Sequence, residues 1–84
     1  MRIERDSQGG ITTIRLIGRF QSEHVQELKK QLQHDGSQFI LDLAEVTLVD
    51  VDVVRFLEIC KAGGVEMVNC SPYIREWMKQ ERQL

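Results

Sequence analysis

The sequence predicts an α/β fold: a two-layer domain in which a mostly parallel four-stranded sheet, its first strand antiparallel in a hairpin, carries three helices on one face. Segments typical of strands and helices alternate in the order β-β-α-β-α-β-α, which favours parallel pairing through right-handed crossovers. The strands alternate apolar with polar residues, as expected when helices cover only one face of a sheet. The length of 84 residues suits a single domain over residues 1–84.

The chain begins with a predicted β-hairpin. An alternating stretch starts at Ile3 and ends in the turn-forming residues 7–10, where paired glycines adopt positive φ at little cost. A second strand over residues 11–17 is rich in β-branched residues, and residues 18–21 then break the pattern. We therefore expect the first two strands to pair antiparallel.

The first helix is predicted to begin at Ser22, which can cap its N-terminus, with Glu23 in the first turn where the helix dipole favours negative charge. Residues 35–37 end this helix, and Gly36 suits a left-handed C-cap. The apolar residues recur at helical spacing: Val25, Leu28 and Leu32.

A central strand and a second helix follow. The strand is predicted over residues 39–43, and residues 44–47 lead out of it. The helix starts near Asp50, whose carboxylate can cap the exposed backbone N–H groups, and it ends at residues 62–64.

The last strand is predicted over residues 65–68. The third helix follows, with Ser71 as its cap and Pro72 in its first position, where the missing N–H costs nothing. The polar residues 79–84 are expected to fray. The buried face of this helix is predicted to hold Ile74, Trp77 and Met78.

Four apolar residues are predicted on the uncovered face of the sheet, mixed with charged residues: Ile11, Ile17, Ile40 and Val68. Two interpretations stay open. Scattered apolar residues are normal on a solvated surface. The same face could instead pair two copies of the chain as a homodimer.

Composition and charge narrow the classes of partner. The net charge is -2 with acidic and basic residues interspersed, so the basic stripe needed for nucleic-acid binding is missing. No apolar run approaches the ~20 residues that span a bilayer, so no membrane insertion is expected. Residues 1–6 hold no apolar run that could act as a signal peptide, which points to the cytoplasm.

No catalytic pattern stands out. His24 and His34 lie at opposite ends of the first predicted helix and cannot share a metal ion there. Cys60 and Cys70 form no C-x-x-C pair and are expected to be reduced thiols, at least one of them in the core. Phosphate-loop, dinucleotide-binding and serine-hydrolase motifs are missing. We therefore expect no enzyme activity, no metal and no cofactor.

One segment carries an unusual pattern. Asp50 and Asp52 lie at the N-terminus of the second predicted helix, where capping and the helix dipole explain both carboxylates structurally. Val51 and Val53 are poor choices for solvent in a first helical turn, which favours a recognition surface at this place. Both interpretations stay open.

This segment and three others resemble the STAS domains, whose best-known members are bacterial anti-sigma factor antagonists. Residues 17–20 are similar to the end of the family's opening strand, residues 39–43 to its central strand, and residues 63–69 with Ser71 and Pro72 to its last strand and turn. The resemblance implies a sheet with sequential strand order and helices on one face. It also implies partner binding, since an antagonist docks the start of its central helix on a kinase-like anti-sigma factor.

The family motif at that helix start is Asp-Ser-Ser-Gly, and phosphorylation of the second hydroxyl residue abolishes docking. Here Asp50 matches the leading aspartate, while Asp52 occupies the phosphoacceptor position. The usual Ser/Thr switch is therefore missing: Asp52 either mimics a phosphorylated state or belongs to a surface that works without the switch. The partner surface implied by the resemblance comprises Asp50, Val51, Asp52, Val53 and Arg55.

Two alternatives belong beside this hypothesis. Some STAS-like proteins are small structural subunits of lipid-transport complexes and brace a nucleotide-hydrolysing partner, which fits the missing phosphoacceptor. Other STAS domains have been proposed to bind nucleotides or small molecules. Against that alternative, Asp50 and Asp52 would repel phosphate at the helix N-terminus best placed for it.

Overall fold

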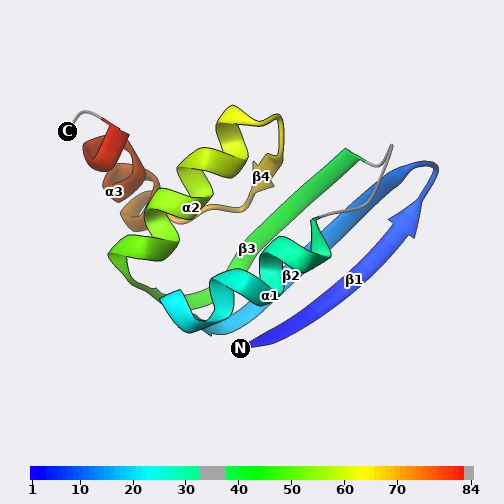
Figure 1. Cartoon of the computed structure of the whole chain (residues 1–84), viewed down its shortest axis with the longest axis horizontal. Helices are drawn as coiled ribbons and strands as arrows, with labels where there is room; N and C mark the ends of the chain where they lie inside the picture. Colours follow the sequence, from blue (N-terminus) through cyan, green and yellow to red (C-terminus); the bar gives the residue numbers. More distant parts are fainter. Residues whose placement is uncertain (33–37, 83–84) are drawn as a thin grey trace.

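The computed structural model describes residues 1–32 and 38–82 and has the predicted α/β architecture (Figure 1). One four-stranded sheet has the order β1-β2-β3-β4, with β1 antiparallel to β2 and the other neighbours parallel. The elements are β1 (Arg2–Gln8), β2 (Ile11–Phe20), η1 (Ser22–His24), α1 (Val25–Gln31), β3 (Gln38–Val49), α2 (Val51–Ala62), β4 (Glu66–Val68) and α3 (Pro72–Arg82).

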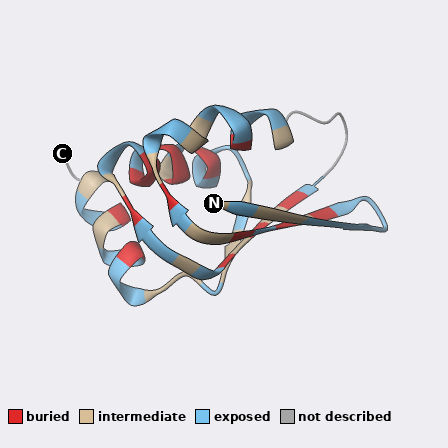
Figure 2. Cartoon of the chain, turned by 90° about the horizontal axis from the view of Figure 1, so that it is seen from below, coloured by how far each residue is buried: buried red, intermediate tan, exposed pale blue. Residues whose placement is uncertain are grey.

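The core lies between one face of the sheet and the helices, which gather on one side of it (Figure 2). Alternate residues of β2 and β3 point into this layer, because successive side chains of a strand face opposite ways. The two-layer prediction is therefore confirmed. The largest fully buried side chains come from β2, α1, β3 and α2: Ile14, Leu16, Phe20, Leu28, Leu41, Leu43, Val53, Val54 and Leu57.

β3 is longer than the sequence pattern predicts, since residues 44–49 continue the strand instead of leading out of it. The register of the pairing with β2 shifts twice, and at each shift β3 contains one residue more than β2. Such a bulge reverses the alternation of inward and outward residues. The residues that face the core therefore fall at every third position: Leu43, Val46 and Val49. The sequence pattern of a strand repeats at every second position, so this spacing does not predict a strand.

The first bulge is held by the carboxylate of Asp42. Its Oδ1 atom accepts hydrogen bonds from the Ala44 N–H, at 3.0 Å, and from Asn69 Nδ2, at 3.1 Å. The Ala44 bond is the main cause that lowers the pKa of Asp42; burial opposes it, and Asn69 and Arg15 add to it. One side chain thus fixes the irregular part of β3 and the residue that follows β4.

The uncovered face of the sheet is dominated by charge. The guanidinium of Arg15 lies between three carboxylates, 3.7 Å from Glu4, 3.7 Å from Asp42 and 3.9 Å from Glu45. Of the predicted apolar residues on this face, Ile17, Ile40 and Val68 are half-buried and only Ile11 is exposed. This arrangement favours the solvated interpretation of the face over a homodimer interface.

The C-terminal prediction was wrong for residues 79–82, which continue α3 instead of fraying. Glu81 explains the difference, because its Oε1 atom accepts a hydrogen bond from Arg55 Nε at 2.8 Å and its side chain is only 13% exposed. At the other end of α3 the predictions are confirmed: Pro72 is the first residue, and Ser71 Oγ accepts a bond from the Ile74 N–H at 3.2 Å. The predicted C-cap at Gly36, together with His34, lies outside the described residues.

We expect Asp42→Ala to lower the free energy of unfolding by about 1.5–3 kcal/mol, because two hydrogen bonds to a carboxylate are lost. Urea denaturation measures the change. Asp6→Ala is the matched control, since Asp6 is an exposed aspartate on β1. Equal losses in the two variants would contradict a specific role for Asp42.

Candidate functional site

The candidate site is built around Asp50, which lies between β3 and α2. Its Oδ1 atom accepts a hydrogen bond from the Val53 N–H at 3.0 Å, so Asp50 caps α2 as predicted. Its Oδ2 atom accepts a second bond, at 2.8 Å, from the N–H of Ser22, the residue that begins η1 just after β2. One carboxylate therefore joins the segments that leave the carboxyl ends of two neighbouring parallel strands, where α/β sheets commonly place their sites.

The predicted capping role of Ser22 was wrong. Gln21 is the residue in the N-cap position: its N–H donates to His24 Nδ1 at 3.0 Å, and its carbonyl accepts from the His24 N–H at 2.8 Å. Ser22 gives its own N–H to Asp50 instead. This bond spans 28 positions of sequence, so local capping rules could not reveal it.

The hydrogen bonds also fix the charge state of Asp50. Burial raises the pKa of its carboxyl group most strongly, but the hydrogen bonds that it accepts, with those from the N–H groups of Ser22 and Val53 the largest, together outweigh that rise. The net pKa lies below the ordinary value, so Asp50 is ionised at neutral pH. A carboxylate fully engaged in this way acts as a fixed structural group rather than as an acid or a base.

The other predicted site residues divide into surface and core. Val51, Asp52 and Arg55 are exposed on the first turns of α2. Val53 is fully buried, so it supports the core and is not available to a partner. Arg55 is already tied to Glu81 of α3 through its Nε atom, which fixes the direction of its side chain.

Two apolar residues extend this surface and were not singled out from the sequence. Leu48 is 44% exposed at the end of β3, and Ile59 is 70% exposed further along α2. Val51, Arg55 and Ile59 follow one another at intervals of four residues, which places them along one face of the helix. We call Leu48, Val51, Asp52, Arg55 and Ile59 the α2 surface. The helical spacing was visible in the sequence, but the exposure of Leu48 depends on the unpredicted bulges of β3.

Metal ligands and cysteine thiols are the other groups of the described residues that bear on chemistry. No group of three His, Cys, Asp or Glu side chains in residues 1–32 and 38–82 is arranged to hold a metal ion. Both cysteines are free thiols; burial raises the pKa of Cys60 to about 11 and also raises the pKa of the half-buried Cys70. Neither thiol is a thiolate at neutral pH, so neither is poised as a nucleophile.

None of the described helices is long and apolar enough to cross a membrane. Neither the models of known protein families nor the curated proteins with which the chain was compared give a match. The STAS resemblance therefore rests on the residues of this chain alone.

We expect Asp50→Ala to lower the free energy of unfolding by about 1–3 kcal/mol, because the cap of α2 and the link to Ser22 are both lost. Asp52→Ala removes an acidic residue from the same helical turn without removing either bond, and its effect should stay below about 1 kcal/mol. Urea denaturation of both variants measures the difference. A loss for Asp52→Ala as large as that for Asp50→Ala would contradict the assignment.

Acid should destabilise the fold through Asp42 and Asp50. The pKa of each is lowered in the folded state, so their stabilising contribution is complete above the ordinary aspartate pKa of 3.8 and is lost as the pH falls below it. Between about pH 5 and about pH 3, unfolding free energy should fall more steeply in the wild type than in the Asp42→Asn/Asp50→Asn double variant. Denaturant titrations across this range provide the measurement, and parallel curves would refute the prediction.

Proposed function

We propose that this chain is a non-catalytic, cytoplasmic regulatory module of the STAS type that binds another protein, as an anti-sigma factor antagonist does. Two features support the proposal. The sheet has sequential strand order with its helices on one face, as the resemblance implies. Asp50, which matches the leading residue of the family motif, caps the central helix at the place where an antagonist docks.

The observation that carries the proposal is the rigid start of α2. Asp50 connects it to the end of β2 through Ser22, and Arg55 connects it to α3 through Glu81. A surface held in place from two sides loses little conformational entropy when a partner binds, so more of the contact energy appears as affinity. Exposed apolar residues on such a surface, here Leu48 and Val51, are the kind that a partner can bury.

The proposed partner is a kinase-like anti-sigma factor, and the proposed contact includes Asp52. Asp52 is exposed, so its charge faces any partner that docks on the start of α2. It carries one negative charge, whereas phosphoserine carries about -1.5 to -2 and three acceptor oxygens. We propose that this smaller charge does not block docking as phosphorylation does, so that the surface works without the Ser/Thr switch and binding is permanent.

A second candidate is a small structural subunit of a transport complex. The observation that favours it is the sequence Asp50-Val51-Asp52-Val53, in which no hydroxyl group is available for phosphorylation. The identity of the captured partner separates the two functions: a nucleotide-hydrolysing transporter subunit supports this one, and a kinase-like regulator supports the first.

We expect Asp52→Arg to weaken partner binding at least tenfold, because it reverses the charge in the first turn of α2, within the α2 surface. Affinity purification from the native host with mass spectrometry identifies the partner, and titration then measures the Kd for wild type and variant. Asp6→Arg is the control, since it makes the same charge change on β1, outside the α2 surface. Undiminished capture of every partner by Asp52→Arg would exclude the α2 surface as the binding site.

A further inference from the structure

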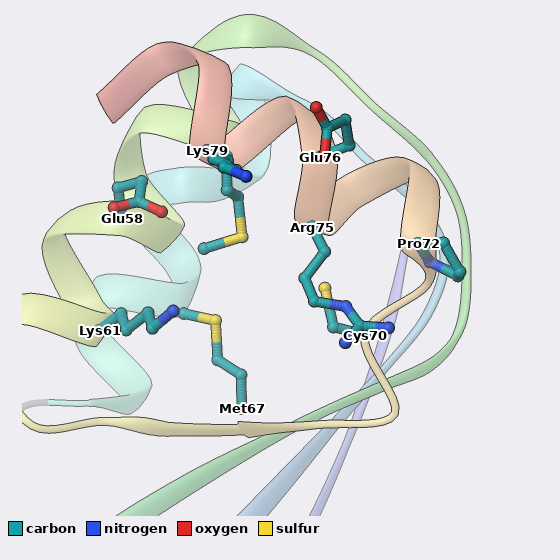
Figure 3. Close-up of a pocket in the computed structure, with 9 residues that line it drawn as sticks. Glu58, Lys61, Met67, Cys70, Pro72, Arg75, Glu76 and Lys79 are labelled. Carbon is teal, nitrogen blue, oxygen red and sulfur yellow. The ribbon is translucent and has the colours of Figure 1, made fainter. Parts of the chain in front are cut away.

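A hollow of about 440 Å³ lies beside the C-terminal half of α2, where α3 begins and β4 passes below (Figure 3). It is at the other end of α2 from Asp50 and shares no residue with the α2 surface. Its volume is within the range of small-molecule sites, about 300–1,000 Å³. The residues on which the inference depends are Glu58, Lys61, Met67, Cys70, Arg75 and Lys79.

Three cationic side chains from two helices meet at this hollow: Lys61 from α2, and Arg75 and Lys79 from α3. Among the described residues, none of the three has a carboxylate within ion-pair distance, whereas Arg15 and Arg55 both have such partners. Two carboxylates, Glu58 and Glu76, also line the hollow, so positive charge is in excess there.

Two of the cations, Arg75 and Lys61, act electrostatically on the thiol of Cys70. Burial raises the pKa of this thiol, while the positive charges of Arg75 and Lys61 oppose the rise. Figure 3 shows the Arg75 side chain lying against Cys70. A ligand atom beside Cys70 would therefore lie against Arg75 (Figure 3) and in the positive field of Lys61, and Met67 adds apolar surface to the same hollow.

Glu58 supplies the second half of the site. Its Oε1 atom is shielded from solvent, yet within the described part of the chain no donor reaches it. A shielded carboxylate oxygen without a donor is unfavourable, so a ligand O–H or N–H group towards which the Glu58 side chain turns gains more here than at an exposed acceptor. The site thus offers cations for an anion and, separately, an acceptor for a donor.

We propose that this hollow binds a small organic phosphate or carboxylate that also carries a hydroxyl or amino group. The anionic group lies against Arg75 and in the positive field of Lys61, the donor reaches Glu58, and the carbon atoms between them cover Met67 and Cys70. This site is independent of the proposed protein-binding function, since it uses none of the residues of the α2 surface.

Alkylation of Cys70 reports occupancy in the intact protein, and the buried Cys60 serves as an internal reference. The probes are glycerol phosphate, methyl phosphate, glycerate and glycerol. Glycerol phosphate should slow alkylation of Cys70 and bind about tenfold tighter than methyl phosphate, because only the former carries hydroxyl donors. Glycerol should have no effect on the alkylation of Cys70. Comparing the protection by glycerate with that by glycerol phosphate shows whether the site prefers a carboxylate or a phosphate.

Variants separate the two halves of the site. Arg75→Gln should weaken every anionic probe about tenfold, while Lys30→Gln, a change at an exposed lysine of α1, should leave binding unchanged. Glu58→Leu should abolish the preference for glycerol phosphate over methyl phosphate. The proposal is overturned if no anionic probe protects Cys70, if Arg75→Gln and Lys30→Gln behave alike, or if Glu58→Leu keeps the preference.

Discussion

The carboxylate of Asp50 is the group on which the arrangement of the α2 surface depends. It lies directly after β3, caps α2 and accepts a hydrogen bond from the N–H of Ser22 in the segment after β2. Each of its two oxygens accepts from one of the two donors. The helix fixed in this way contributes Val53, Val54 and Leu57 to the core. Asp50 therefore affects both the geometry of the α2 surface and the stability of the fold.

β3 carries the second constraint, because it crosses the whole sheet between β2 and β4. Its two extra residues let Leu43, Val46 and Val49 all point to the core, although the plain alternation of a strand would turn some of them outward. The second bulge also determines which way the side chains of the last residues of β3 face. Leu48 faces out and Val49 faces in, immediately before Asp50.

Fold class and the caps at Asp50 and Ser71 could be predicted because local patterns determine them: periodicity for the elements, and side-chain acceptors three residues before an N–H for the caps. The strand order came instead from the resemblance to the STAS domains. Ser22 and Glu81 were misjudged for the opposite reason, since each is fixed by a partner more than 25 positions away in sequence. Val53 shows a third limit. Valines alternating with aspartates do not reveal which valine faces the core, and only the packing of α2 decides it.

The sheet edges have a consequence for how this domain can meet other chains. An open edge invites another strand to pair with it, and natural proteins discourage this with short edge strands and charged side chains. Here β4 offers three residues, and its chain leaves at Asn69 with a φ of 58°, a conformation that does not continue a strand. The opposite edge, β1, carries Arg2, Glu4 and Asp6. Growth of the sheet into a shared or fibrous one is thus disfavoured at both edges, and helices and loops are left as the parts that can engage other molecules.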